Sequence, residues 1–144
     1  MVVKKMKMKK IFFILPIVIG SIISCSKSSD SGSSTPVPPP AETPVAFTIN
    51  ASNNSVSLTN GFAVTATLTS IMPSSKGITI ETTLVNQTTS SNIAQSAAIT
   101  STSAVNNLQL VNLPQQHFCT ATIKVSSVAT PSNSASQSFT VVYK

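Results

Sequence analysis

The chain is short of nearly every residue type on which catalysis depends. Its 144 residues include no arginine, no tryptophan, one histidine and only three acidic residues. A general acid–base pair needs two ionisable groups whose environments separate their pKa values, and beyond residue 44 the only acid is Glu81. That residue falls on the outward side of a predicted strand, as a solvated surface charge. A Ser-His-Asp triad needs a histidine held by a carboxylate, and His117 has no acid nearby in sequence. We therefore predict that the protein is not an enzyme.

The sequence also has few of the residues that form metal-binding and phosphate-binding sites. His117 and Cys119 are two positions apart, so on a strand they would form at most a two-ligand pair, whereas zinc takes three or four protein ligands. Calcium sites need several carboxylates. Beyond Cys25 only three glycines occur, too scattered for a phosphate-binding loop. We predict neither a metal nor a cofactor.

Positive charge is concentrated at the front of the chain. Five of the nine lysines lie within the first ten residues, and from Cys25 onward four lysines face three carboxylates, a net charge of +1. Nucleic-acid binders cluster Lys and Arg to neutralise phosphates. The sequence beyond Cys25 has no such cluster, so nucleic acid is excluded as a partner.

The lysines are followed by an apolar run, Ile11–Ile23, of 13 residues. A membrane-spanning helix needs about 20, whereas this length is typical of a signal peptide. The run ends in Ile22-Ile23-Ser24-Cys25, which resembles a bacterial lipoprotein signal. The resemblance implies that residues 1–24 are a signal peptide, that Ile22, Ile23 and Ser24 are read by the processing machinery, and that Cys25 is lipidated. Ordinary secretion and a retained membrane anchor are the alternatives, and translation starting at Met1, Met6 or Met8 leaves this reading unchanged.

Lipidation would determine the state of the two cysteines. A thioether-linked Cys25 has no sulfur free to pair, so Cys119 would be a lone thiol, which is usually a small buried hydrophobe. The alternative is a Cys25–Cys119 disulfide in a non-lipidated, extracytoplasmic protein.

Beyond Cys25 the composition changes twice. Residues 25–44 are rich in Ser and Pro without apolar periodicity, and they predict a disordered linker of flexible and polyproline segments. Residues 45–144 show apolar alternation with period two, punctuated by turn signals. The clearest inward sets are Phe62, Val64, Ala66 and Leu68; Ile78, Ile80, Thr82 and Leu84; Cys119, Ala121, Ile123 and Val125; and Phe139, Val141 and Tyr143. Asn60-Gly61 predicts a hairpin turn before the first of these strands. The pattern predicts an all-β fold with a single antiparallel sandwich.

One stretch suggests a family. Leu108, Leu110 and Leu113, followed by the alternating Ala121, Ile123 and Val125, resemble the E and F strands of fibronectin type III domains. The resemblance covers about 30 residues and implies an immunoglobulin-like sandwich. The position of the family's corner tyrosine is Cys119 here, its proline falls one place early at Pro114, and its B-strand tryptophan is missing.

The outward strand positions are dominated by Ser, Thr, Asn and Gln. Such a surface is common in secreted sandwiches, but amides and hydroxyls also hydrogen-bond sugar hydroxyls. Glycan sites normally add an aromatic platform, and Phe118, with parity opposite to Cys119, is the candidate ligand-facing ring. We therefore expect a non-catalytic binding module of the cell envelope. It would be anchored in the outer membrane by the lipid on Cys25, displayed on the cell surface, and would bind a glycan or protein. The alternative is a periplasm-facing structural accessory of an envelope complex; the sequence does not predict the oligomeric state.

Overall fold

The computed structural model describes residues 40–144, which belong to one compact unit. The predicted signal peptide, the lipidation site Cys25 with Ile22, Ile23 and Ser24, and most of the linker lie outside the described residues. Within the described part of the chain there is no helix long and apolar enough to cross a membrane.

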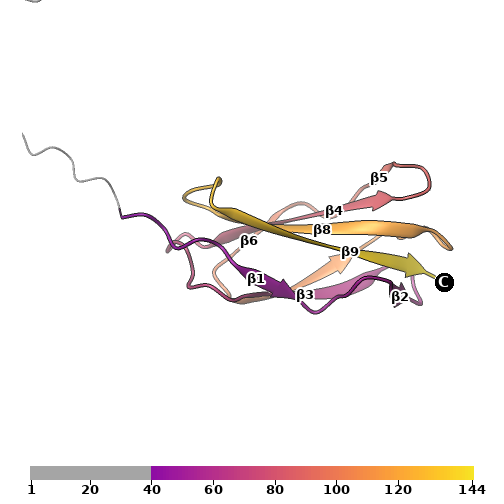
Figure 1. Cartoon of the computed structure of the whole chain (residues 1–144), viewed down its shortest axis with the longest axis horizontal. Coiled ribbons are helices and arrows are strands. Elements are labelled where there is room, and N and C mark those ends of the chain that lie inside the picture. Colours follow the sequence, from indigo (N-terminus) through magenta and orange to yellow (C-terminus); the bar gives the residue numbers. More distant parts are fainter. Residues whose placement is uncertain (1–39) are drawn as a thin grey trace, which may run out of the picture. The chain divides into compact units, whose positions relative to one another are not determined.

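Nine β-strands make up the unit, and they run along its length with loops gathered at its two ends (Figure 1). In chain order they are β1 (Phe47–Ile49), β2 (Ser55–Ser57), β3 (Phe62–Leu68), β4 (Ile78–Asn86), β5 (Asn92–Ile93), β6 (Ile99–Ser101), β7 (Val105–Leu110), β8 (Phe118–Ser127) and β9 (Ser134–Tyr143).

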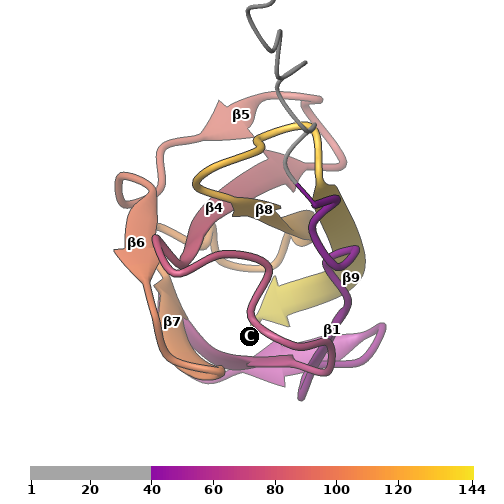
Figure 2. The ribbon, with the colours of Figure 1, turned by 90° about the vertical axis from the view of Figure 1, so that its left-hand side faces the viewer.

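The strands form two sheets that face each other. One sheet has the order β1-β3-β7, and the other has the order β2-β9-β8-β4-β5, with β6 also paired to β4. Figure 2 shows the two layers end-on, with β7 and β1 in one and β4, β8 and β9 in the other. The predicted all-β sandwich is confirmed, and its strand pairing is compatible with an immunoglobulin-like fold.

Strict alternation places the apolar residues between the sheets. Along β8, Cys119, Ala121, Ile123 and Val125 are buried, while the intervening Thr and Lys residues are partly or fully exposed. The same holds in β3 and β4, so the inward sets predicted for these strands are confirmed. Thr82 is the one half-buried member of the β4 set, and it lines a cleft described below. Because the strand period is two, this pattern fixes the register of every long strand.

The structure corrects the prediction of a hairpin at Asn60-Gly61. These residues join β2, in the larger sheet, to β3, in the smaller one, so they cross between the layers. Neither has the positive φ that a type I′ turn requires. The sheet is also not wholly antiparallel, since β2 runs parallel to β9, with Val56 opposite Val142.

The chain enters the unit along the loop between β8 and β9. The Asn133 amide accepts a hydrogen bond from Val45 N at 2.8 Å, and its Nδ2 donates to Thr43 O at 2.9 Å and to Glu42 Oε2 at 3.2 Å. Residues 42–45, which straddle the predicted end of the linker, are therefore fastened to the sandwich by one side chain.

Candidate functional site: an apolar patch on the six-stranded sheet

Three apolar side chains lie in a row across the outer face of the larger sheet. Val142 on β9 is directly opposite Val56 on β2 and directly opposite Phe118 on β8. Gln87 continues the row, because its backbone N–H donates to Phe118 O at 2.9 Å just beyond the end of β4. Directly opposed residues have Cβ atoms about 5 Å apart, so the three form one surface, which we call the Phe118 patch.

Exposure within the Phe118 patch is uneven. Val142 is only 6% exposed although it faces outward, whereas Val56 is 46% and Phe118 is 48% exposed. The central valine is therefore covered, whereas about half of the surface of Phe118 remains available. Leu58, in the loop directly after β2, is 83% exposed and adds apolar surface at the same end. Solvent-exposed apolar groups that gather in one place are typical of interaction sites.

Hydrogen-bonding side chains border the aromatic ring. Gln87 Nε2 donates to Thr120 Oγ1 at 3.0 Å, which orients the amide beside Phe118. His117 Nδ1 lies 3.4 Å from Thr88 Oγ1, on the turn that follows β4. These groups combine donors and acceptors without a fixed charge, so the border suits a neutral polar ligand.

The next row of the same face is polar and ordered. Thr140 Oγ1 accepts from Asn54 N at 2.7 Å and donates to Asn54 Oδ1 at 3.3 Å. Further along the sheet, Thr122 and Ser138 hydroxyls meet at 2.7 Å. Since these hydroxyls are held by hydrogen bonds to Asn54 or to each other, the face is a pre-arranged polar surface rather than a set of freely rotating groups.

One charged residue of this face, Lys144, lies near the Phe118 patch: it follows Val142 by two positions, and its backbone N–H donates to Ser57 O at 3.1 Å. The ion pair of this face is remote from the patch. The ion pair between Lys124 Nζ and Glu81 Oε2, at 3.7 Å, involves two half-exposed side chains. Lys124 is six residues from Phe118 along β8, a separation of about 20 Å at 3.3 Å per residue. Screening over a Debye length of about 8 Å leaves little of this field at the ring.

The structure places the residues singled out from the sequence in different environments. Phe118 faces outward, as its parity indicated, and Cys119 is fully buried in the core. Burial raises the pKa of the Cys119 thiol, which keeps it protonated and unreactive. His117 lies in the turn before β8, and the Cys119 sulfur meets its backbone carbonyl at 4.0 Å rather than its ring. Within residues 40–144 no three His, Cys, Asp or Glu side chains gather as metal ligands would.

Two members of the Phe118 patch escaped the sequence analysis. Val56 belongs to a three-residue strand flanked by serines, too short for periodicity to reveal. Val142 follows Val141, so it interrupts the alternation of β9 and both residues are buried, one on each face. The sequence signal that could have identified Val142 is the run Val141-Val142-Tyr143. Three consecutive apolar residues indicate a strand that is covered on both faces, whereas a strand buried on one face alternates.

Comparison of the chain with protein-family models, with curated proteins and with solved structures gives no match.

Proposed function

We propose that the protein is a lipid-anchored lipoprotein of the cell envelope whose sandwich is a non-catalytic binding module displayed on the cell surface. The anchor rests on the sequence Ile22-Ile23-Ser24-Cys25 after a short apolar run. The binding role rests on one observation: an aromatic ring that is 48% exposed and bordered by an oriented amide and hydroxyls. No ligand is needed to explain the fold, but an exposed Phe contributes nothing to the core.

We also propose that the sandwich is immunoglobulin-like, of the fibronectin type III kind. In support, β7 and β8 follow one another in opposite sheets, as the E and F strands of that family do. Leu108, Leu110 and Leu113 are buried, as the resemblance implies. The three-stranded sheet and the order β9-β8-β4 of the other sheet follow the same plan.

The ligand that fits the Phe118 patch best is a neutral glycan. The apolar face of a sugar ring packs on an aromatic side chain, and its hydroxyls exchange hydrogen bonds with amides and hydroxyls. Gln87, Thr88 and Thr120 supply these groups around Phe118. A protein ligand with an exposed apolar residue is the second candidate, because Val56 and Leu58 extend the apolar surface away from the polar groups.

The position of the Phe118 patch suits display. The described chain begins at one end of the unit, next to the β8–β9 loop, whereas β2, the start of β8 and the C-terminus lie at the other end (Figure 1). A module fastened through its N-terminal segment would thus present the patch on its far side.

Protease treatment of intact cells tests the location. A C-terminally tagged chain should lose its tag on intact cells, and a Cys25→Ser variant should be released or mislocalised. A tag that is protected until lysis would refute surface display and favour the alternative, a periplasm-facing accessory, to be pursued by cross-linking in the envelope.

A glycan array tests the ligand. Phe118→Ser should abolish binding that the parent protein shows. Val105→Ser is the matched control, because Val105 is 54% exposed on the other sheet and its loss should leave binding unchanged. Equal binding by the parent and the Phe118→Ser variant would refute the assignment of the site.

A further inference from the structure

One long edge of the smaller sheet has a gap in its hydrogen bonding. β7 is the last strand of the order β1-β3-β7, so only one of its edges is paired. Leu68 N donates to Ala104 O at 2.7 Å, and in an antiparallel ladder the bonding direction alternates from residue to residue. The even-numbered residues of β7 therefore direct their backbone groups at β3. Val105, Asn107 and Gln109 direct theirs away from it.

Side chains close this edge at both ends. At one end the Ser103 hydroxyl accepts from Val105 N at 3.3 Å and donates to Val105 O at 2.9 Å. At the other end the side-chain amide of Gln95 replaces the backbone of a neighbouring strand. Its Oε1 accepts from Val111 N at 3.0 Å and its Nε2 donates to Val111 O at 2.8 Å. Between these caps, Asn107 and Gln109 have no backbone partner on this edge within residues 40–144. The opening thus offers two donors and two acceptors in the spacing of a β-strand.

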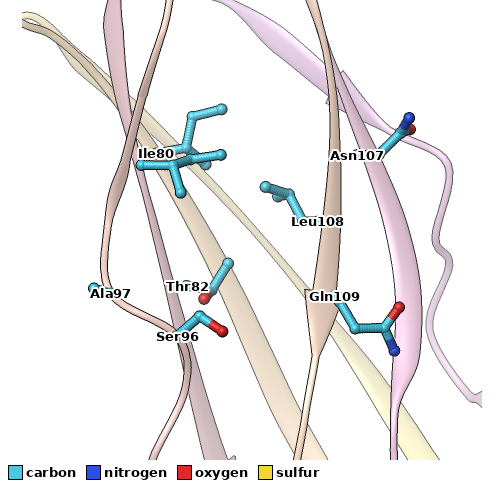
Figure 3. A pocket seen from close by; sticks show the side chains of 8 residues that line it. Ile80, Thr82, Ser96, Ala97, Asn107, Leu108 and Gln109 are labelled. Atoms are coloured by element: carbon cyan, nitrogen blue, oxygen red, sulfur yellow. The ribbon is translucent and has the colours of Figure 1, made fainter.

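A cleft lies beside this opening (Figure 3). It has a volume of about 180 Å³ and lies between β7 and the segment that leads from β5 to β6. Ile80 and Leu108 point into it from the two sheets, whereas the Asn107 and Gln109 side chains lie on the far side of β7. These two residues therefore border the cleft with their backbone. The remaining lining is small or aliphatic, namely Thr82, Ser96, Ala97 and Ile99.

We propose that this edge of β7 binds a short, extended, uncharged peptide segment of another protein by strand addition, with one aliphatic side chain inserted into the cleft. Main-chain hydrogen bonds supply affinity in this mode, and pockets for alternate side chains supply specificity. The caps at Ser103 and Gln95 limit the added strand to about five residues, from the number of positions between Val105 and Val111. The cleft has room for one side chain, since a cavity of about 150 Å³ accepts benzene.

The lack of ionisable side chains in the cleft determines which peptide side chains can enter it. No ionisable side chain lines the cleft, so a Lys or Glu inserted there would lose its hydration without gaining a partner. β7 itself, Val-Asn-Asn-Leu-Gln-Leu, carries neither the charge nor the proline with which natural proteins protect edge strands. The added segment is therefore neutral at the inserted position, and the edge does not repel it.

The test uses the full ¹⁵N-labelled chain, purified in a mild detergent, and capped peptides Thr-Thr-Val-Thr-Thr and Thr-Thr-Lys-Thr-Thr. The valine peptide should shift the amide signals of Asn107 and Gln109 and slow their exchange with solvent. The lysine peptide should bind at least about tenfold more weakly, because its charged side chain would lose hydration in the cleft without gaining a partner. Absence of binding at millimolar peptide, or equal binding of the two peptides, would overturn the proposal.

Gln109→Pro removes one outward N–H without removing a ladder bond to β3, because proline is tolerated where an edge N–H faces outward. Gln109→Thr keeps that N–H and is its control. We expect the proline variant to bind the valine peptide about tenfold more weakly than the threonine variant; equal affinities would overturn the proposal.

A second pair avoids any folding defect caused by proline. Ile99→Glu places a charge at the cleft and should abolish binding, whereas Ile71→Glu, at a 76% exposed site that does not line the cleft, should leave it intact. Self-association of the chain without peptide, lost in Gln109→Pro, would assign the edge to a second copy and overturn the peptide assignment.

Discussion

Asn133 holds the entering chain against the sandwich, and its removal should produce a local and measurable loss. The side chain is partly buried in the loop before β9 and makes three hydrogen bonds to the segment from Glu42 to Val45. Val45 is 7% exposed and Phe47, two residues on, is 5% exposed. The amide thus fixes the backbone just where the first core residues begin.

The magnitude follows from which groups water can reach after Asn133→Ala. Val45 N, which belongs to a buried residue, would lose its partner, at about 1–3 kcal/mol for an unsatisfied buried donor. Thr43 O is on an exposed residue and Glu42 is only partly buried, so both can be rehydrated at about 0.5 kcal/mol each. We expect the free energy of unfolding to fall by about 2–4 kcal/mol in all.

Urea denaturation of Asn133→Ala and Asn133→Asp would test this reasoning. The Asp variant keeps an acceptor for Val45 N, loses the two donors and faces Glu42, so about half of the loss is expected. Hydrogen exchange should show that the Val45 amide loses protection in the Ala variant and keeps it in the Asp variant. A loss below about 0.5 kcal/mol in the Ala variant, within the range of ordinary surface substitutions, would refute a fastening role.

Three further outcomes are expected. Phe139 is 2% exposed with its ring centroid 5.8 Å from that of Phe62, so Phe139→Ala should cost about 3–5 kcal/mol in urea denaturation. Burial raises the pKa of the Cys119 thiol from its ordinary value of 9.0. Its contribution is therefore complete below pH 9 and lost as the pH rises further; urea titrations at pH 7–10.5 should show this decline in the parent but not in Cys119→Ala. Phe118→Ser should change stability by less than about 1 kcal/mol, because the ring is half exposed.

Much of the sandwich could be predicted because burial on one face imposes a period of two on a strand. Ile123 and Val64 are buried where the alternation placed them, and Phe118 is exposed for the same reason. The face on which a strand residue lies follows from its position along the strand, so it can be predicted without knowing the partner strands. The outward position of the candidate aromatic ring was within reach of the sequence, whereas the Phe118 patch was not.

What could not be predicted depends on which strand pairs with which. Val56 gains its place beside Val142 only through the parallel pairing of β2 with β9, a contact between residues 86 positions apart. The gap on β7 likewise depends on pairing: it exists because no strand pairs with that edge, and Gln95 and Ser103 set its two ends. Neither side chain carries a sequence signal for that role, since glutamine and serine are common in loops.

The wrong prediction of a hairpin at Asn60-Gly61 can be tested by mutation, because a glycine with positive φ tolerates a side chain less well than a glycine without it. Had Gly61 occupied a type I′ turn, a side chain would be strained there. In the structure its φ is not positive, and an added Cβ would meet Gln109 Nε2, the movable end of a side chain, at 2.6 Å and the backbone oxygen of Leu110 at 3.1 Å, a tight contact that a shift of a few tenths of an ångström relieves. Gly61→Ala should therefore change stability by less than about 1 kcal/mol, helped by a less flexible unfolded chain.

Gly77 is the opposite case. Its φ is +85°, and an added Cβ would collide with the backbone carbonyl of Ser101 on β6. The left-handed conformation alone costs a residue with a side chain about 1–2 kcal/mol, and the carbonyl cannot move aside without disturbing the pairing of β6 with β4. Gly77→Ala should therefore destabilise the protein by more than about 2 kcal/mol. Equal losses for Gly61→Ala and Gly77→Ala in thermal or urea denaturation would contradict this distinction between a glycine with positive φ and one without.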